Sequence, residues 1–241
     1  MTDYKEYLSQ IRFNFLQPHH VVPEKAHKIF SLLSKTGIDL EMANTRLPDR
    51  SLLLKAGFKK LCRIPRMSTF AVGALIQRGV FLMPEGSAFV NVGVWHGFTL
   101  LSGMMGNPDK RCIGIDNFSE FGGPREEFLK RFSRHKSDRH FFYEEDYRVY
   151  FTKHHQDPIG FYIYDGEHSY QNQLEGLKAA EPFLCKGAVI LVDDTNWPEP
   201  YQASLDFIRQ SRYRYEVLFD QKTAVKTHPT FWNGIFIFRR L

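Results

Sequence analysis

Cysteine is scarce in this chain of 241 residues, and none of its apolar runs is long. The three cysteines, Cys62, Cys112 and Cys185, are widely spaced among apolar residues, which favours reduced packing thiols over a disulfide framework or a zinc-thiolate site. The longest apolar runs, such as "FAVGALI" and "AVILV", fall far short of the ~20 residues of a membrane helix. The opening "MTDYKEYLSQ" has no apolar core of a secretion signal, so we expect a cytoplasmic protein without a membrane partner.

Internal repeats, low-complexity tracts and a full G-x-G-x-x-G motif are also missing. A strong excess of one charge is missing too, because 32 Lys and Arg face 27 Asp and Glu, for a net charge of +5. The densest basic stretch, "KRFSRHKSDRH" at 130–140, fits a solvated helix face as well as a binding surface. Charge alone therefore does not predict a nucleic-acid partner.

The sequence does contain the apolar content of a folded protein, 43% hydrophobic residues, in one large domain or one domain with an appendage. Residues 1–85 have helical periodicity. A helix over "PEKAHKIFSLLSKTG" would place Ile29, Leu32 and Leu33 on one face, a second follows Asp49, and a third runs from Ser68 to about residue 79.

From about residue 86 short apolar strands alternate with helical stretches. This alternation predicts an α/β fold: a doubly wound, Rossmann-like, mostly parallel sheet closed by an antiparallel strand pair, with the N-terminal helices added to it. Seven strands are expected, at 87–93, 111–116, 139–146, 160–165, 187–194, 213–221 and 232–241.

Ligands of such sheets bind outside the carboxyl ends of the strands, so the residues that end each strand are the candidates. The first strand ends at Gly93, and Gly97 stands at the start of the next helix. Glycines there allow close approach of a ligand to the backbone, and free helix amides favour an anionic group. A plain tight turn explains the same residues.

Asp116 ends the second strand, 23 residues after Gly93, where an acid can accept the hydroxyls of a ribose. The alternative is a turn or cap aspartate. The loop "SEFGG" behind it has the glycine content of a lid. At the end of the third strand, Asp146 can accept from the exocyclic amine of a purine, or it is a solvated acidic turn.

Asp165 ends the fourth strand, and the pair Asp193 and Asp194 ends the fifth. One helix joins these strands, so the crossover rule makes them parallel and close neighbours. Three carboxylates brought together repel one another unless a proton or a cation joins them, and oxygen ligands select a hard ion, most simply Mg²⁺. Helix capping by Asp194 and amide contacts to Asp165 are the alternative.

Glu167 and His168 flank this cluster at the start of the helix capped by Ser169. Either can take a proton from a hydroxyl, and the sequence does not choose between them.

Four motifs carry a family resemblance: "VNVGVWHGFT", "GIDNFSEFGGP", "YDGEHSY" and "LCKGAVILVDDTNW". In this order, residues 66–241 resemble the class I S-adenosylmethionine-dependent methyltransferases, within them the small-molecule branch of macrocin O-methyltransferase and cephalosporin hydroxylase-like proteins. The resemblance implies that the first glycine turn holds the methionine part of S-adenosylmethionine, and that Asp165 and the Asp193, Asp194 pair chelate a divalent ion. It implies these cofactor-binding positions: Asn91, Gly93, Trp95, Gly97, Asp116 for the ribose, Asp146 for the adenine, and Asp165.

Two residues depart from the family pattern. Asn91 stands where an acid is usual and keeps an acceptor without the charge, and Ala188 stands where a second glycine is common. Residues 1–65 match no named family and form a separate N-terminal segment, expected to be a substrate lid or a dimer contact.

The expected function is O-methylation of a hydroxyl on a small molecule, such as a sugar, a natural product or an aromatic compound, assisted by the divalent ion. A non-catalytic binding or scaffold protein of the same fold is the alternative, and Asn91 suits it. A nucleic-acid methyltransferase is disfavoured because the fourth strand ends "YDGEH" instead of a (D/N/S)PPY segment. The missing G-x-G-x-x-G disfavours a dehydrogenase.

Overall fold

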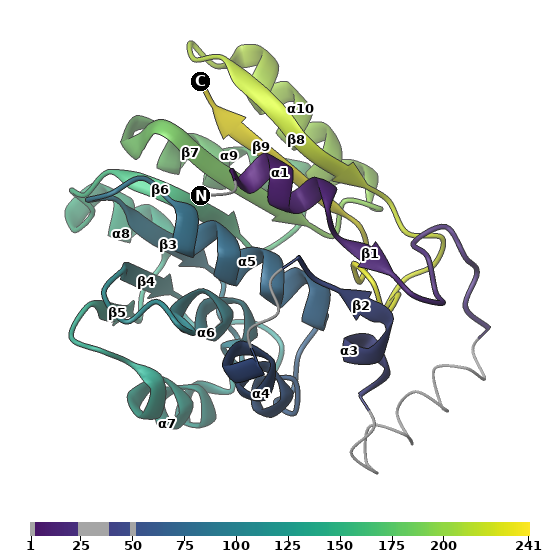
Figure 1. Ribbon diagram of the computed structural model, residues 1–241. Helices are drawn as coiled ribbons and strands as arrows, with labels where there is room; N and C mark the ends of the chain where they lie inside the picture. The colour runs from purple at the N-terminus through teal and green to yellow at the C-terminus, as the bar shows by residue number, and fades with distance from the viewer. Residues whose placement is uncertain (1–2, 24–38, 49–51) are drawn as a thin grey trace.

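A central sheet of seven strands organises the chain in the computed structural model, which describes residues 3–23, 39–48 and 52–241 (Figure 1). All neighbouring strands are parallel except β9, which runs antiparallel to both of its neighbours. The predicted α/β fold with a terminal antiparallel pair is thus confirmed. The spatial order is β5 (His140–Tyr143), β4 (Arg111–Ile115), β3 (Ala88–Val92), β6 (Ile159–Tyr164), β7 (Leu184–Asp193), β9 (Ile235–Arg240) and β8 (Tyr215–Gln221).

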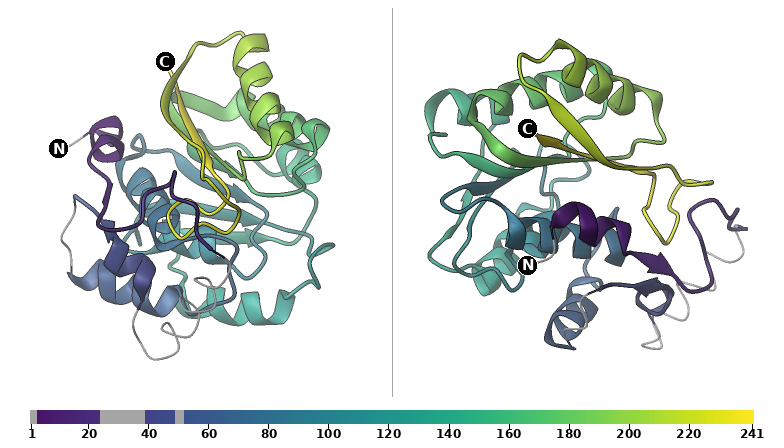
Figure 2. Two further views of the ribbon diagram at one scale, coloured as in Figure 1. Left: turned by 90° about the vertical axis from the view of Figure 1, so that its right-hand side faces the viewer. Right: turned by 45° about the horizontal axis from the view of Figure 1, so that its top comes forward.

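Helices cover both faces of this sheet, as the two views of Figure 2 show. One face carries α5 (Phe70–Leu82), α6 (Phe98–Met104) and α7 (Arg125–His135), and the other carries α8 (Tyr147–Lys153), α9 (Tyr170–Ala180) and α10 (Pro198–Gln210). A short 3₁₀ turn, Glu181–Phe183, links α9 to β7.

Alternation along the strands builds one apolar core on each face. In β6, Phe161 and Ile163 join the core under α5, α6 and α7, whereas Tyr162 and Tyr164 join the core under α8, α9 and α10. Because successive strand residues point to opposite faces, a strand covered on both sides is apolar throughout. All six residues of β6 are buried.

The amino-terminal part of the chain packs on the first face. Helix α1 (Tyr4–Ser9) lies beside α5 and β8, and the Tyr4 hydroxyl donates to the Leu75 carbonyl at 3.0 Å. Helices α3 (Leu40–Asn44) and α4 (Leu52–Leu61) follow, and the latter confirms the helix expected after Asp49.

Two features of this part differ from the prediction. Residues 12–13 and 45–46 form a small antiparallel pair, β1 (Arg12–Phe13) and β2 (Thr45–Arg46), where only helices were expected. Two-residue strands carry too little alternation to be seen in a sequence. The helix predicted over 23–37 lies outside the described residues, apart from Pro23.

Helix α8 was not predicted either, although α6, which also has seven residues, was. Among the described residues, none of the helices has the length and hydropathy needed to cross a bilayer. All three cysteines are free thiols.

Candidate functional site

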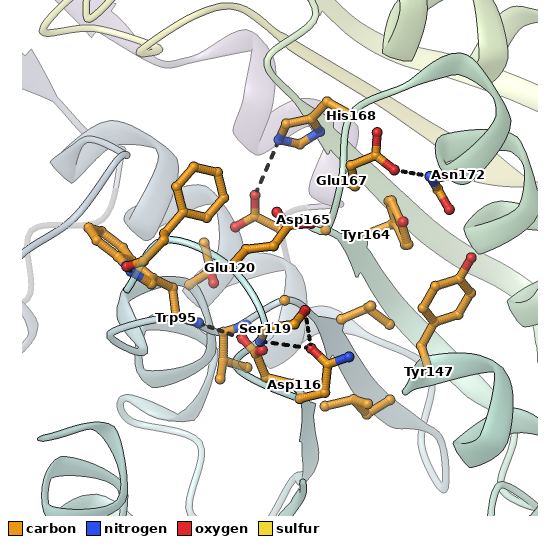
Figure 3. Close-up of a pocket in the computed structure, with 18 of the residues that line it drawn as sticks. Trp95, Asp116, Ser119, Glu120, Tyr147, Tyr164, Asp165, Glu167, His168 and Asn172 are labelled. Carbon is orange, nitrogen blue, oxygen red and sulfur yellow. Dashed lines mark hydrogen bonds and ion pairs between the residues drawn. The ribbon is translucent and has the colours of Figure 1, made fainter. Parts of the chain in front are cut away.

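A cavity of about 490 Å³ opens at the carboxyl ends of β3, β4, β6 and β7 (Figure 3). Register brings those ends level, since Val92 pairs with Ile115 on one side and with Tyr164 on the other. The residues that follow each strand therefore stand side by side. Of the predicted site residues, these line the cavity: Gly93, Trp95, Asp116, Asp146, Asp165, Glu167, His168, Asp193 and Asp194.

The turn after β3 passes very close to the end of β6. Gly93 has φ +78°, and a Cβ there would lie 2.0 Å from the Asp165 carbonyl oxygen. Only glycine provides both this φ and this clearance. Close packing against the Asp165 backbone thus requires a glycine here, and Gly93 also lines the cavity.

Asp116 holds the same turn in place. Its Oδ2 accepts from the amides of Val94 and Trp95, both at 2.8 Å, and its Oδ1 accepts from the Phe118 amide at 2.7 Å. The turn-aspartate role that the sequence left open is thus present. Each carboxylate oxygen has a further lone pair, so a ribose contact at the cavity is compatible with it.

The predicted lid loop folds over the turn. The Trp95 indole donates to the Phe121 carbonyl at 3.2 Å, and Phe121 itself is 67% exposed. Positive φ values at Phe118, Phe121 and the following glycines give the loop its tight path.

Asp146 caps the next helix. Its Oδ1 accepts from the Arg148 amide at 2.7 Å at the start of α8, and Tyr147 beside it also lines the cavity. The cap leaves Oδ2 with only a 3.4 Å ion pair to Arg148.

Asn91 and Gly97 are not among the residues that line the cavity, and their contact with a cofactor stays a prediction. Asn91 is fully buried and donates through Nδ2 to the Gly93 carbonyl at 3.0 Å. A Cβ at Gly97 would lie 2.9 Å from the Phe128 ring, so this glycine allows α7 to pack. A motif glycine that serves helix packing cannot be distinguished by sequence from one that faces a ligand.

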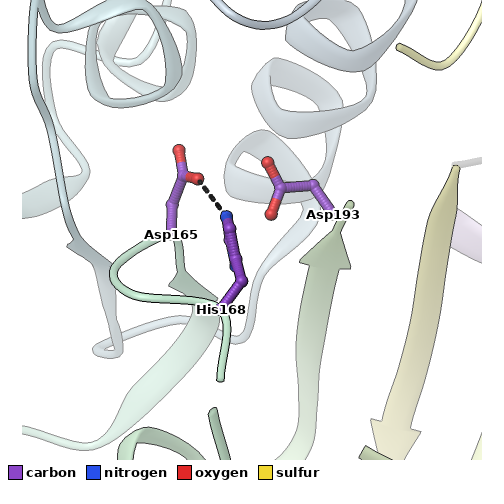
Figure 4. A group of neighbouring side chains, drawn as sticks. All are labelled: Asp165, His168 and Asp193. Atoms are coloured by element: carbon purple, nitrogen blue, oxygen red, sulfur yellow. Dashed lines mark ion pairs between the residues drawn. The ribbon is translucent and has the colours of Figure 1, made fainter. Parts of the chain in front are cut away.

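The acids of β6 and β7 meet around His168 (Figure 4). Asp165, His168 and Asp193 each offer a ligand atom, and these atoms lie within 4.8 Å of one another. Asp194 lies beside this group, with its Oδ2 at 3.1 Å from His168 Nε2. The corresponding distance from His168 Nε2 to Asp165 Oδ1 is 3.9 Å.

Mutual repulsion is visible in the acid–base properties of the cluster. Burial, followed by the charges of Asp193 and Asp194, raises the pKa of Asp165 well above its usual value. Burial and the charge of Asp194 raise the pKa of Asp193 to about 6. Burial opposes protonation of His168, but the hydrogen bond to Asp194 and the nearby carboxylates outweigh it and raise the pKa of His168.

A divalent cation would fit this set. Asp193 Oδ1 is buried and has no hydrogen-bond partner among the residues that the structure describes. The carboxylates of Asp165 and Asp193 are ligands that Mg²⁺ or Mn²⁺ accept. The fit rests on these donors, and Asp194 as a further ligand stays a prediction.

Glu167 is turned away from the cluster. Its carboxylate is exposed and bonds the Asn172 side-chain amide, as Figure 3 shows, whereas the His168 side chain is only 15% exposed and faces the acids. Of the two proton acceptors predicted, only His168 lies within the acid cluster.

Sequence reasoning missed the contribution of the segment before α5. Arg66, Met67 and Ser68 line the cavity, and Arg66 is fixed by an ion pair to Glu41 at 3.1 Å. No sequence motif identifies such residues, because their place depends on how the amino-terminal helices dock. Trp197 also lines the cavity and lay unassigned within the motif "VDDTNW".

Comparison with known families gives one match: residues 90–195 match the model of a methyltransferase domain. No curated protein matches the chain.

Solved structures share the fold over most of the chain. An O-methyltransferase from Bacillus cereus, in complex with SAH, is 13% identical with a TM-score of 0.57, over 89% of this chain and 97% of that one. CalS11, a TDP-rhamnose 3′-O-methyltransferase of calicheamicin biosynthesis, is 18% identical with a TM-score of 0.54, over 92% and 97%. A putative rRNA methylase from Clostridium thermocellum is 14% identical with a TM-score of 0.52, over 71% and 97%. At such identities these likenesses show a common fold.

Proposed function

We propose that this chain, whose residues 90–195 match the model of a methyltransferase domain, is a class I S-adenosylmethionine-dependent methyltransferase that methylates a hydroxyl group of a small molecule with the help of a divalent cation. One observation carries the proposal: the Asp165, His168 and Asp193 group lies in the same cavity as the glycine turn and Asp116. A cofactor site and an acid–base site thus share one space.

The residues around the turn suit S-adenosylmethionine. Its ribose hydroxyls and adenine amine are hydrogen-bond donors, and the carboxylates of Asp116 and Asp146 are acceptors that line the cavity. The Trp95 indole adds an apolar wall. When bound, this cofactor supplies a methyl group on a positively charged sulfur.

Asp165 and Asp193 are the residues that would hold the divalent ion. An ion there lowers the pKa of a hydroxyl that binds to it. Their carboxylates come from adjacent strands, so the ligand pair is held by the sheet, and a rigid pair loses little entropy on binding.

His168 is the residue we assign as general base. Its Nε2 faces the acid cluster and would take the hydroxyl proton, and Asp194 at 3.1 Å would stabilise the imidazolium that forms. Glu167 is less suited because its carboxylate is occupied by Asn172 and exposed.

The acceptor is expected to carry a ring next to its hydroxyl. Three of the large apolar side chains that remain exposed line this one cavity: Met67 at 42%, Phe121 at 67% and Trp197 at 37%. An exposed apolar rim around a polar centre is typical of a site for a ring with polar substituents, such as a sugar or an aromatic diol.

The first experiment measures S-adenosylhomocysteine binding by calorimetry. We expect binding to the wild-type chain, and at least about tenfold weaker binding by Asp116→Asn, because the variant loses charged acceptor oxygens. Asp138→Asn, an exposed acid in the loop before β5, is the matched control. No binding at millimolar ligand would contradict the proposal and favour a scaffold role.

The second experiment tests the ion and the base with labelled S-adenosylmethionine and a panel of catechols and nucleotide sugars. Methyl incorporation should require Mg²⁺ or Mn²⁺ and be lost in EDTA. Asp165→Asn, Asp193→Asn and His168→Gln should each lose activity while keeping S-adenosylhomocysteine binding. Full turnover in EDTA would exclude the metal role.

A further inference from the structure

Gln173 of helix α9 is a buried polar side chain without a structural explanation. It is 0% exposed, and neither its Nε2 nor its Oε1 has a hydrogen-bond partner within the part of the chain that the structure describes. Leaving a buried amide unbonded costs about 1–3 kcal/mol. A glutamine kept in such a place needs a partner that forms in the working protein.

His168 has the matching deficit. Its Nδ1 is buried and has no hydrogen-bond partner among the described residues, while its Nε2 faces Asp194 at 3.1 Å. One ring nitrogen therefore faces the acid cluster, and the opposite one is a buried donor or acceptor still to be satisfied.

The helix brings these two side chains together. Ser169 caps α9, and the backbone amide of Gln173 donates to the Ser169 carbonyl at 3.0 Å, so Gln173 stands one turn into the helix. Side chains of a helix lean toward its amino terminus and cover the preceding turn, which here is where His168 lies. Gln173 is also among the groups that raise the pKa of His168, after burial and the neighbouring carboxylates, which agrees with an amide oxygen on that side of the ring.

We propose that Gln173 is a positioning residue whose Oε1 accepts a hydrogen bond from Nδ1–H of His168. The bond holds the imidazole plane so that Nε2 is the nitrogen that exchanges a proton with the cavity. The purpose of this contact rests on the function proposed above, but the contact itself does not.

An amide suits this position better than a carboxylate. The histidine of a catalytic site is often oriented by a second group at its inner nitrogen, and an aspartate or glutamate is a frequent choice. Three carboxylates already repel one another around His168, namely Asp165, Asp193 and Asp194. A neutral acceptor orients the ring without adding a fourth buried negative charge.

Nuclear magnetic resonance of histidine labelled with ¹⁵N tests the contact without cofactor, metal or acceptor. At a pH where His168 is charged, we expect a ring Nδ1–H signal that exchanges slowly with water and shows a nuclear Overhauser contact to the Gln173 side chain. His168→Gln identifies the signal by removing it. The wild-type spectrum alone decides the contact: a Nδ1–H that exchanges as fast as that of exposed His19, or that contacts another side chain, would overturn the proposal.

Variants then separate positioning from mere packing. Gln173→Leu keeps the volume of the side chain and removes the acceptor. Exchange of Nδ1–H with water should then be about tenfold faster or more, because this factor corresponds to the net free energy of a hydrogen bond to a charged group. Gln173→Glu keeps an acceptor oxygen and should restore slow exchange. Gln171→Ala, whose exposed side chain bonds Glu175 on the same helix turn, is the control and should change nothing. An unchanged signal in Gln173→Leu would overturn the proposal.

A loss of the contact and a loss of the proposed function are distinguishable. Absence of S-adenosylhomocysteine binding would contradict the methyltransferase proposal, but the Nδ1–H signal of His168 could still be observed and would still decide the contact with Gln173. Conversely, if the signal is absent while methyl transfer is intact, only the role of Gln173 fails. With both present, Gln173→Leu should lower kcat about tenfold or more without weakening S-adenosylhomocysteine binding.

Discussion

Asp165 contacts both the glycine turn after β3 and the acid cluster. Its backbone carbonyl touches the space that a side chain at Gly93 would need, and its amide donates to the Val92 carbonyl at 2.8 Å. Its side chain meanwhile faces His168 and Asp193. One residue thus joins the packing of two strands to the chemistry of the site.

The repulsion among the acids of the cluster leads us to predict that Asp165→Asn stabilises the protein in the absence of metal. Removing one of the crowded negative charges should raise the melting temperature in EDTA by roughly 2–6 °C, since about 1–2 kcal/mol of repulsion is relieved in a protein of this size. Mg²⁺ should stabilise the wild type, because an ion that binds only the folded state adds stability, and should no longer stabilise the variant.

Differential scanning fluorimetry with and without Mg²⁺ makes this measurement, and Asp138→Asn is the control for loss of an exposed acid. A melting temperature of Asp165→Asn below that of the wild type in EDTA would contradict the repulsion. An equal rise in melting temperature on adding Mg²⁺ to the variant and to the wild type would contradict the cation site.

At the scale of the elements, the unit β6, α9 and β7 assembles the acids. The two strands are adjacent and parallel, with Ile163 opposite Leu191, so Asp165 stands opposite Asp193 two residues later. The sequence predicted this meeting because a single-helix crossover has one hand. It did not predict the turn after β7, where Asp194 adopts φ +51° and turns its carboxylate to His168.

The glycine turn of β3 is the second element of the site, and Gly93→Ala tests it. A Cβ would overlap the Asp165 carbonyl at 2.0 Å, so the ends of β3 and β6 must separate. We expect loss of S-adenosylhomocysteine binding and a fall in unfolding free energy of more than about 2 kcal/mol.

Gly86→Ala is a matched control, because Gly86 has φ +75° but no atom lies within 4 Å of the added carbon. It should cost only about 1–2 kcal/mol of backbone strain and keep ligand binding. Urea unfolding and calorimetry measure both effects. Equal losses in the two variants would show that strain, and not the close approach to Asp165, governs the turn.

The seven strands of the sheet and the helices α5, α6, α7, α9 and α10 were predicted from alternation and helical spacing, α6 although it has only seven residues. Helix α8, which is equally short, and the pair β1 and β2 were not predicted. The two-residue strands are too short for a period to appear. Their contacts with the rest of the chain decide their structure.

On the scale of the whole molecule, the first helix ties the amino terminus to the centre and to the last strands. Tyr4 is buried against α5, and Lys5 pairs with Glu216 of β8, while Arg239 of β9 pairs with Asp3 at 3.0 Å. The N-terminal extension predicted at 1–65 is thus packed on the sheet domain in its described parts. Its role as a lid or dimer contact stays a prediction.

Tyr4→Phe measures that docking. The variant leaves the buried Leu75 carbonyl without the Tyr4 hydroxyl, so we expect a loss of about 1 kcal/mol in urea unfolding. Lys5→Ala removes an ion pair between partly exposed groups and should lose less than about 0.5 kcal/mol, less still at high salt. A larger loss for Lys5→Ala than for Tyr4→Phe would mean that surface charge, and not the buried bond, holds the helix.

The sequence by itself determined the sheet, its layers and the acids at its carboxyl edge. Hydrophobic periodicity reports which faces are buried, and the handedness of crossovers then determines which strand ends meet. The tertiary structure alone decided what each side chain does there. It turned Glu167 outward, paired Asp194 with His168 and brought Arg66 to Ser68 into the cavity. The physical reason is that a residue's direction at a strand end depends on local dihedral angles and on docked neighbours, and neither leaves a period in the sequence.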